Sequence, residues 1–427
     1  MNYIESAQVF GFWGSKTVEI AFFKDLNFLI GPNGSGKTTI INLISAALRA
    51  DIPALYAINF DKLIIKLKSI GASNKPTIEI TKITDSAMGS IDLQYTIREK
   101  ASDKGTVYGV EGPFDERLYR DPRYARSRRM NEAGARLSVI LSDFVEVNWI
   151  SVHRASLDRS PRSSRDEEFD TTIDLKVDEI AKKFASYFSL LANKAAEESK
   201  SFQEAIFLSL LEQERSGASI FSVESGNSEE KENIVGVLKD LGVANTKAMK
   251  SVSSHYSRLD QAVTKIKSGD PLLIDDAITL SDAVRVRKTI SNWRDLNRKR
   301  AEIFKPRIIF EEIINELFTG KELHFDVRNN PRIHLANQTQ VPISMLSSGE
   351  KQLFIILGEA LLQENRPVVF ISDEPELSLH VSWQQALFSN VRKLNTACQI
   401  ISATHSPDIV GSFQNNVIQM KDCLRDV

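Results

Sequence analysis

Gly-Pro-Asn-Gly-Ser-Gly-Lys-Thr, residues 31–38, is a complete G-x-x-x-x-G-K-[ST] phosphate-binding loop. The stretch before it, Leu26–Ile30, is short and mostly apolar, which is typical of a buried strand. Behind it, Thr39–Ala50 carries apolar residues at helical spacing. A strand, a glycine-rich turn and a helix form the context in which this pattern predicts a site for a nucleoside triphosphate.

Each residue type in the loop suits phosphate chemistry. Glycines let backbone N–H groups turn toward phosphate oxygens, and the helix N-terminus adds partial positive charge. We expect Lys37 to reach the β- and γ-phosphates of ATP, and the Thr38 hydroxyl to bind Mg²⁺. The predicted nucleotide contacts are Asn33, Gly34, Ser35, Gly36, Lys37, Thr38 and Thr39.

The overall composition is that of an ordinary globular protein. The chain has 427 residues, 42% hydrophobic and 26% charged, which allows two or three domains. Its net charge of −2 gives no global attraction to nucleic acid or membrane. Two cysteines, Cys398 and Cys423, argue against a disulfide framework. Because neither a secretory signal nor a membrane-length apolar run is evident, we expect a cytoplasmic location.

Strand-like sequence lies on both sides of a helical middle. Apolar residues between 172 and 318 recur at steps of three and four, which predicts a helical insertion, either an ordinary amphipathic domain or partly a coiled coil. We therefore predict one α/β domain split into an N-terminal lobe (1–165) and a C-terminal lobe (321–427) by a helical insertion or dimerisation domain (166–320). Strands are predicted at Tyr3–Phe12, Val18–Phe23, Leu26–Ile30, within 75–110, and at Val145–Val152, Leu323–Val327, Val368–Ser372 and Cys398–Ala403.

A second site element follows a hydrophobic strand in the C-terminal lobe. Asp373 and Glu374 come directly after Val368–Ser372. An acidic pair at a strand end is often only a solvated surface feature. Paired with the phosphate loop, however, it predicts that Asp373 holds Mg²⁺ or its water shell and that Glu374 polarises the water that attacks the γ-phosphate.

Two further segments complete the pattern. Ser347 and Glu350, in Leu346-Ser-Ser-Gly-Glu-Lys-Gln352, form a capping box before an apolar helix, and a capped helix start with Gly349 is also a phosphate-binding end. His405 lies just past the Cys398–Ala403 strand. A lone histidine there is usually structural, but as the last element in this order it is predicted to contact the γ-phosphate.

These four segments resemble, in sequence order, the ATP-site motifs of ABC-type ATPases. Within that superfamily the chain is similar to the OLD, RecF and SMC branch. The signature reads Ser-Ser-Gly-Glu-Lys, and about 300 residues separate it from the phosphate loop. The string Asp373–His380 (Asp-Glu-Pro-Glu-Leu-Ser-Leu-His) is similar to that of OLD-type ATPases. The resemblance covers about the first 60 and the last 100 residues. It implies an ABC-type P-loop ATPase head that uses ATP and Mg²⁺.

The resemblance also implies a homodimer, or a higher even oligomer, of ATPase heads paired head to tail. Ser347 and Gly349 of one subunit would then meet the γ-phosphate held by Lys37 of the other. Two departures stand out: Ser348 replaces a usual glycine, and the loop after Glu374 lacks the aspartate that ends it in transporters and SMC heads. The resemblance also implies a glutamine that contacts Mg²⁺; the sequence does not place it, and His153, after the Val145–Val152 strand, is the candidate for its position.

OLD enzymes carry a nuclease domain after the ATPase, whereas this sequence stops about 20 residues after His405. We therefore expect a stand-alone ATPase whose effector, a nuclease, is a separate protein. That arrangement is similar to ATPase subunits of anti-phage systems, such as AriA of PARIS and PtuA of Septu. A DNA-repair ATPase of RecF or SMC type that clamps DNA is the alternative, and a nucleotide-binding scaffold with negligible turnover is a third reading.

An arginine-rich segment, Arg117–Arg129, repeats arginine every third residue with Tyr119 and Tyr124 between. It predicts either a surface for a polyanion, DNA or a protein that mimics it, or a solvated loop balanced by nearby acids such as Asp115 and Asp121.

Overall fold

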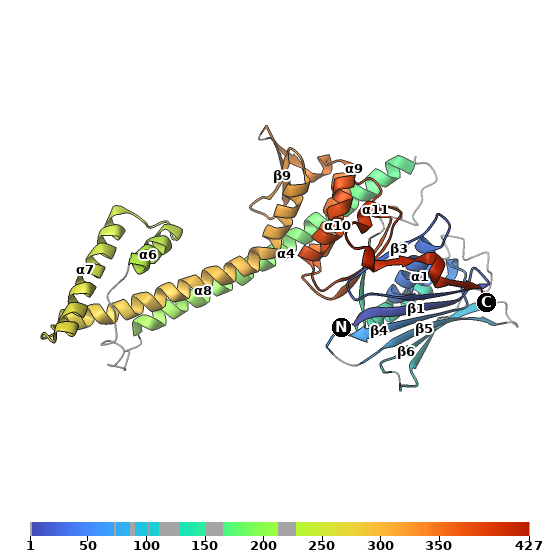
Figure 1. Cartoon of the computed structure of the whole chain (residues 1–427), viewed down its shortest axis with the longest axis horizontal. Coiled ribbons are helices and arrows are strands. Elements are labelled where there is room, and N and C mark those ends of the chain that lie inside the picture. Colours follow the sequence, from blue (N-terminus) through green and yellow to red (C-terminus); the bar gives the residue numbers. More distant parts are fainter. Residues whose placement is uncertain are drawn as a thin grey trace. The chain divides into compact units, whose positions relative to one another are not determined.

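The computed structural model describes residues 2–71, 74–85, 90–100, 102–110, 128–150, 165–211, 228–337 and 339–426 (Figure 1). Its contacts divide the chain into two compact units, Met1–Ala185 with Arg307–Val427, and Ser186–Pro306. We call them the head unit and the helical unit. The fold is α/β, and the helical unit interrupts the head in sequence, as predicted.

A five-stranded parallel sheet forms the centre of the head unit. Its order is β14-β3-β13-β12-β8, and every neighbouring pair is parallel. The strands predicted before the phosphate loop and before the acidic pair are therefore joined through one strand, β13. The bounds are β3 Leu26–Ile30, β8 Glu146–Ile150, β12 Val368–Asp373, β13 Gln399–Ala403 and β14 Val417–Gln419.

A seven-stranded antiparallel sheet supplies the second layer. Its order is β15-β2-β1-β4-β5-β6-β7. Strand β4, Lys62–Ser69, is not among the predicted strands, although it alternates buried and less buried residues as a half-buried strand should. The other bounds are β1 Asn2–Phe12, β2 Lys16–Ala21, β5 Thr77–Asp85, β6 Ser90–Arg98, β7 Thr106–Val110 and β15 Leu424–Asp426.

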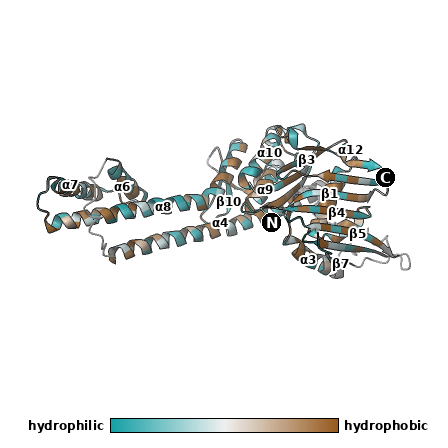
Figure 2. Ribbon diagram, turned by 60° about the horizontal axis from the view of Figure 1, so that its bottom comes forward, coloured by the Kyte–Doolittle hydropathy of each residue, from teal (hydrophilic) through white to brown (hydrophobic). Residues whose placement is uncertain are grey.

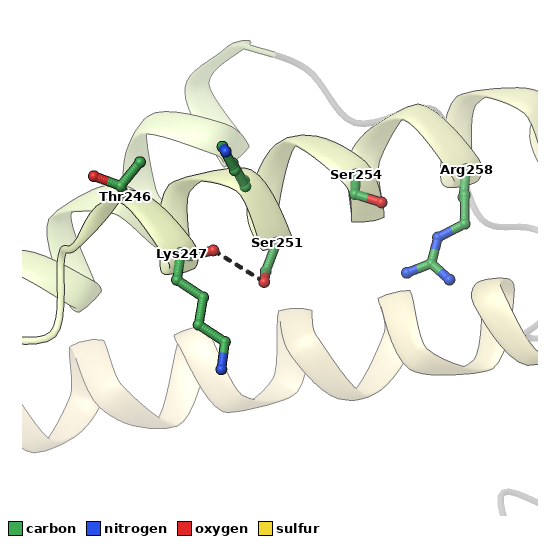
Figure 3. A pocket seen from close by; sticks show the side chains of 6 residues that line it. Thr246, Lys247, Ser251, Ser254 and Arg258 are labelled. Carbon is green, nitrogen blue, oxygen red and sulfur yellow. Dashed lines mark hydrogen bonds between the residues drawn. The ribbon is translucent and has the colours of Figure 1, made fainter.

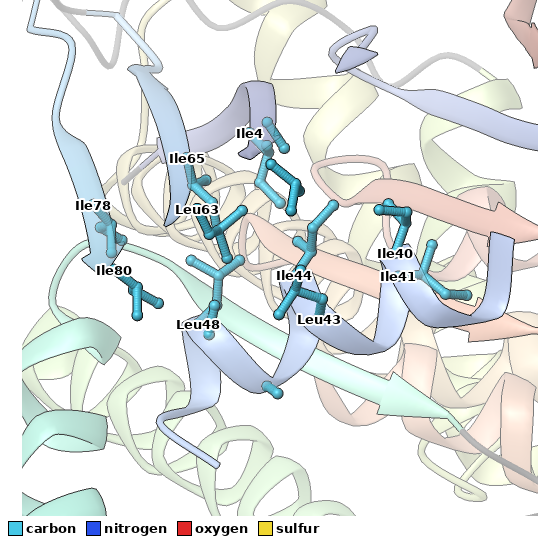
Figure 4. Packing of buried hydrophobic residues seen from close by; sticks show 14 of the residues in the cluster. Ile4, Ile40, Ile41, Leu43, Ile44, Leu48, Leu63, Ile65, Ile78 and Ile80 are labelled. Carbon is cyan, nitrogen blue, oxygen red and sulfur yellow. The ribbon is translucent and has the colours of Figure 1, made fainter. Parts of the chain in front are cut away.

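Helix α1, Lys37–Arg49, packs into a single hydrophobic cluster that contains residues of both sheets (Figure 4). Ile41 and Ile44 of α1 lie in this cluster with Ile65 of β4 and Ile371 of β12. Each such side chain stabilises the fold by about 1.5–3 kcal/mol when fully buried. The core therefore fixes the helix that follows the phosphate loop. Helices α2 (Ile52–Ala57) and α3 (Arg128–Ser142) pack beside α1.

A buried amide ties the two sheets together. Gln399 of β13 accepts a hydrogen bond from the Ile4 N–H (2.8 Å) and donates to the carbonyls of Ile4 (2.9 Å) and Phe23 (2.8 Å). Buried polar groups are costly unless they are paired, so this amide permits one register between β13 and β1.

The rest of the head unit surrounds α9, the helix that follows the signature. Phe354 of α9 contacts Phe184 and Phe310, and Phe184 also contacts Phe325. The elements here are the head ends of α4 (Arg165–Leu211) and α8 (Ile274–Leu317), β9 Lys321–Phe325, β10 Pro331–Leu335, β11 Gln340–Pro342, the 3₁₀ turn Ile343–Met345, α9 Ser348–Leu362 and α10 Val381–Leu394. Short elements near the C-terminus are α11 Pro407–Val410, the 3₁₀ turn Gln414–Asn416 and α12 Met420–Cys423.

The helical unit consists of the remaining parts of α4 and α8 with α6, Ser228–Asp240, and α7, Thr246–Ser268. Its core includes Tyr256, Leu259 and Val263 of α7 with Leu280 and Ala283 of α8. Hydrophilic and hydrophobic residues alternate along α4 and α8 (Figure 2). Within the described ranges, every helix is too short or too polar to cross a membrane.

Candidate nucleotide-binding site

The phosphate loop connects β3 to α1, as predicted, and its backbone leaves the start of α1 open. Gly34 and Gly36 have φ of 79° and 91°, left-handed values that favour glycine. Gly36 is the N-cap of α1, and no side chain caps the helix. The Ser35 hydroxyl is buried without a hydrogen-bond partner among the described residues. Unpaired N–H groups at a helix start are an anion-binding site, so the loop fits a phosphate chain.

Lys37 occupies the centre of the loop. Its ammonium donates hydrogen bonds to the carbonyls of Gly31 (2.9 Å) and Pro32 (3.3 Å), and the residue is 4% exposed. Burial lowers the pKa of Lys37 below its ordinary value, although the nearby carboxylates of Glu374 and Asp373 act in the opposite direction. The lysine is therefore a desolvated cation held by weak acceptors, which phosphate oxygens can replace.

One hydrogen bond joins the two halves of the predicted site. The Thr38 hydroxyl donates to Asp373 Oδ1 over 2.9 Å, although the residues are 335 positions apart in sequence. The parallel pairing of β3 with β13 and of β13 with β12 places the ends of these strands at one sheet edge. A hydroxyl and a carboxylate at this distance are the hard oxygen donors that Mg²⁺ takes, so the pair fits that ion.

Glu374 and His405 lie together at the same edge. Glu374 Oε1 is 3.7 Å from His405 Nε2, and both side chains are 35% exposed. The Glu374 N–H donates to the Ala403 carbonyl (2.9 Å), and its backbone is left-handed, with φ of 47°. A non-glycine residue in this conformation is strained, and such strain is often found at functional positions. The acid is thus held beside the imidazole and remains open to water.

Glu376 is a site residue that the sequence analysis did not single out. Its Oε1 accepts hydrogen bonds from the Thr404 hydroxyl (2.7 Å) and from the N–H groups of His405 (2.9 Å) and Ser406 (3.2 Å). Its Oε2 is buried without a partner in the described part of the chain. Three donors on one oxygen fix the backbone that carries His405. Its sequence signal was its place in the Asp373–His380 string, two residues after Glu374.

The signature segment forms the start of α9 with a complete capping box, as predicted. The Ser347 hydroxyl accepts from the Glu350 N–H (3.4 Å), and the Ser347 N–H donates to Glu350 Oε2 (2.8 Å). Lys321 contacts the same carboxylate over 2.7 Å. Burial would raise the pKa of Glu350, but the hydrogen bonds from Lys321 and Ser347 hold it below its ordinary value. Glu350 is therefore an anion at neutral pH.

Gly349 lies against a neighbouring loop rather than in open space. A Cβ atom at this position would overlap the carbonyl oxygen of Ser378. Gln352 of α9 donates to the Pro375 carbonyl (3.0 Å) in the same loop. The loop after Glu374 therefore touches the signature helix through Pro375 and Ser378, and the His405 backbone through Glu376. Within one chain the contacts of Ser347 and Gly349 are with α9 and this loop, while Lys37, Thr38, Asp373, Glu374 and His405 come together at the sheet edge.

An exposed tryptophan beside the phosphate loop was also missed. Trp13, at the β1–β2 turn, is 44% exposed, stacks on Phe12 (4.5 Å between centroids) and has φ of 56°. A Cβ on Gly36 would lie 3.1 Å from each of the two rings, so Trp13 packs directly against the loop. Its sequence signal is an aromatic residue between two glycines, Gly11 and Gly14, ahead of the phosphate loop.

A pocket of about 520 Å³ opens at the carboxyl ends of β14, β3 and β13. Gly31, His405 and Gln419 are among its lining residues. Asn33 is exposed at the tip of the loop, and Thr39 lies half-buried in the first turn of α1. His153 and most of the Arg117–Arg129 segment lie outside the described residues.

The fold and this arrangement define an α/β P-loop ATPase head split by a helical insertion. The chain belongs to the AAA_15 family of AAA ATPase domains, which matches residues 3–410.

No curated protein sequence matches the chain. Among solved structures, the Smc head domain of Pyrococcus furiosus, with an extended coiled coil and bound to the C-terminal domain of ScpA, is 17% identical (TM-score 0.43; 98% of this chain and 93% of that chain covered). The Smc head domain of Pyrococcus yayanosii with a coiled coil and joint is 14% identical (TM-score 0.38; 98% and 95% covered). An SmcHead bound to the C-winged helix domain of ScpA is 13% identical (TM-score 0.43; 98% and 93% covered).

Proposed function

We propose that this chain binds ATP with Mg²⁺ and hydrolyses it as a dimerising switch that controls a separate effector. The observation that carries the proposal is the Thr38–Asp373 hydrogen bond, because it brings the phosphate loop and the acidic strand end into one site. The open N-terminus of α1 and the buried Lys37 ammonium support phosphate binding.

The roles of the side chains follow from their chemistry. Lys37 and the N–H groups of the loop bind the β- and γ-phosphates. Thr38 and Asp373 would hold Mg²⁺, which neutralises phosphate charge when bound. Glu374 orients and polarises the attacking water, and His405 contacts the γ-phosphate. Trp13 offers a flat exposed face on which the base can stack.

The switch requires a second copy of the chain. In this proposal Ser347 and Gly349 of a partner head complete the γ-phosphate site, so that ATP holds two heads together and hydrolysis releases them. The lobes 1–165 and 321–427 would form each head, with 166–320 as the inserted domain. In support, Ser347 and Gly349 contact the signature helix and the loop beside it in their own chain, and not Lys37.

The effector in this proposal is a nuclease encoded separately, and the setting is cytoplasmic anti-phage defence. The support is the Asp373–His380 string and its similarity to OLD-type ATPases. Copurification of the native chain with the product of its neighbouring gene, followed by mass measurement, tests this part. A nuclease-like partner is the expected result, and a repair protein would contradict it.

A DNA clamp of RecF or SMC type is the second candidate. The observation that favours it is a set of three cations on α7, Lys247, Lys250 and Arg258, for which the described part of the chain supplies no carboxylate partner. Both candidates share the ATP chemistry, so the copurified partner separates them.

The catalytic role of Glu374 is tested by Glu374→Gln. The amide keeps the shape and can still hold water, but it cannot act as a base, so we expect kcat to fall by about 100-fold or more. ATP should still bind, and the ATP-dependent dimer should persist. Steady-state phosphate release and size-exclusion chromatography with ATP provide the measurements.

The matched control is Glu364→Gln, an exposed acid that follows α9. It should leave turnover unchanged. Normal turnover by the Glu374→Gln variant would remove Glu374 from the catalytic role.

A further inference from the structure

One face of α7 carries polar and basic side chains at helical spacing. Lys247, Ser251, Ser254 and Arg258 are separated by four, three and four residues, which places them on one side of the helix. Figure 3 shows these side chains projecting from the same side of α7. All four are exposed, and the neighbouring Thr246 and Lys250 are exposed as well. We call these six residues the α7 cationic face.

The orientation of this face is fixed by packing. The other side of α7 buries Tyr256, Leu259 and Val263 in the core of the helical unit. Asn245 caps the helix start by accepting from the Ala248 N–H (2.9 Å), and Gly269 ends the helix in a left-handed conformation. The cationic face is thus presented on a helix that is anchored along its length.

Several cations of the helical unit already have a carboxylate partner. Within the helical unit, Lys231 pairs with Asp260, Lys265 with Asp276, Arg287 with Glu230 and Lys299 with Glu198. For Lys247, Lys250 and Arg258, by contrast, the described residues supply no carboxylate within ion-pair distance. Helix α7 contains five Lys and Arg but a single acid, Asp260, in a chain whose net charge is −2. Positive charge is therefore concentrated on α7, and at these three residues the described carboxylates do not neutralise it.

The face lines a shallow depression of about 620 Å³. Its lining is Thr246, Lys247, Lys250, Ser251, Ser254 and Arg258, a set without a large apolar or aromatic side chain. An apolar peptide or an amphipathic helix would find nothing to bury there. Short hydroxyls between the cations allow close approach: Ser251 donates to the Lys247 carbonyl (3.1 Å) and would have to exchange that bond for an anionic oxygen, while the Ser254 hydroxyl can donate to one directly.

We propose that the α7 cationic face binds the phosphate backbone of duplex DNA. From Lys247 to Arg258 the helix rises by about 16 Å, and duplex DNA carries one negative charge per ~1.7 Å of its axis. A straight, anchored row of cations can therefore meet several phosphates of one duplex. Binding would not depend on base sequence, because the lysines, the arginine and the hydroxyls of this face suit the phosphate backbone rather than the edges of particular bases.

Two other polyanionic partners fit less well. Binding to an anionic membrane as an interfacial helix needs an apolar face, and that side of α7 is buried in the core. Single-stranded nucleic acid is usually held by stacking on aromatic side chains, and the depression has none among its lining residues. Duplex DNA needs only the cations and hydroxyls that are present.

The experiment compares the wild-type full chain with a triple variant, Lys247→Gln, Lys250→Gln and Arg258→Gln. Fluorescence anisotropy with a labelled duplex of about 30 base pairs, at about 50–200 mM salt and without ATP, measures affinity and its salt dependence. The triple variant should bind about tenfold or more weakly, and the slope of log K against log salt should fall by about 2–3.

A matched triple variant, Lys194→Gln, Lys267→Gln and Arg300→Gln, removes the same charge from exposed positions of the same unit. It should retain most of the affinity and the salt slope. Equal losses in the two triple variants, or no duplex binding by the wild type at low salt, would overturn the proposal. The proposal would also be overturned if the α7 triple variant lost binding to polyglutamate but kept binding to the duplex, since that result would assign the face to an acidic protein.

The measurement is independent of the proposed ATPase function. Duplex binding is measured without ATP, and hydrolysis without DNA should be the same in the wild type and both triple variants. The ATPase proposal is tested by hydrolysis in Glu374→Gln, and the DNA-binding proposal by duplex binding in the α7 triple variant. Either proposal can therefore be contradicted without affecting the other.

Discussion

Helices α1 and α9 both have glycine and serine residues at or beside their first turn, yet the two first turns are satisfied in opposite ways. Gly36 begins α1 without a side-chain cap, and the first turn of α1 has no acid. Ser347 begins α9 with a full capping box, and Glu350 sits in its first turn with Lys321 beside it. One helix start is open to an anion, and the other already holds the carboxylate of its own chain.

This difference separates two tasks. The α1 start, with Lys37, can bind phosphate alone, because in the described part of the chain the ammonium donates to the carbonyls of Gly31 and Pro32 and is not hydrogen-bonded to a carboxylate. At the α9 start the Glu350 carboxylate opposes any second anion. A γ-phosphate can dock there only if other contacts bring it close, which is what pairing of two heads would do. In the proposed function, the site on α1 would therefore set ATP affinity, and the site on α9 would report the assembly of two heads.

Lys37→Ala should have the largest effect, because it removes the only cation in the open site among the described residues. We expect ATP affinity to fall by about 100-fold or more, while the melting temperature changes little. Isothermal titration calorimetry measures the affinity. Lys194→Ala, at an exposed site in the helical unit, is the control. Tight ATP binding by Lys37→Ala would contradict the phosphate-loop assignment.

Gly349→Ala should separate the two helix starts. The added Cβ would overlap the Ser378 carbonyl, so the signature must shift, while α1 is untouched. We expect ATP to bind normally and hydrolysis to fall by about 10- to 100-fold. Gly236→Ala, where a Cβ meets open space in a helix, is the control. If hydrolysis in Gly349→Ala equals the wild type, the signature has no part in turnover.

Glu376 connects the loop beside the signature to His405, and two substitutions test that link. Glu376→Gln keeps an oxygen that can accept from Thr404 and His405, whereas Glu376→Ala keeps none. We expect kcat to fall by about tenfold in the alanine variant, and the glutamine variant to restore most of it. KM for ATP should change little in both. A parallel loss in both variants would mean that the charge, and not the hydrogen bonds, matters.

The smallest expected effect is on pH dependence. Burial lowers the pKa of Lys37 below 10.5, so the free site loses its proton earlier than an ordinary lysine as pH rises. Phosphate favours the charged amine, so ATP binding takes up a proton in this alkaline range. ATP affinity should therefore fall as pH rises, by at most about tenfold per pH unit. Adenosine, which lacks phosphate, should show no such slope; an equal slope for both ligands would exclude Lys37 as its source.

The sequence predicted the elements that carry their own signal. β3, β12 and β13 are short, mostly apolar segments beside motifs, and the start of α9 is indicated by the capping residues Ser347 and Glu350. The three-residue strands β14 and β15 are too short for any periodicity to be read. Glu376 could not be assigned because its partners are 28–30 residues away and depend on the meeting of β12 and β13.

The roles of the site residues divide in the same way, into those with a local sequence signal and those that depend on the fold. Lys37 and Thr38 were predicted from a local motif, whereas Trp13 becomes a candidate only when the β1–β2 turn is placed against Gly36. Glu374 and His405 were each assigned a role near the γ-phosphate from motif order, and the structure places the two side chains 3.7 Å apart.

The position of β3 has a consequence for how the protein is made. The strand that carries the phosphate loop lies between β13 and β14, and both come from residues 399–419. On the ribosome, about 370 more residues must therefore be synthesised after β3 before the first of its neighbouring strands begins. During that time an apolar strand and a glycine loop are unpaired, a state that favours misassembly and chaperone binding. The same arrangement guards against premature activity, since a nascent chain cannot close its nucleotide site until both lobes have been synthesised.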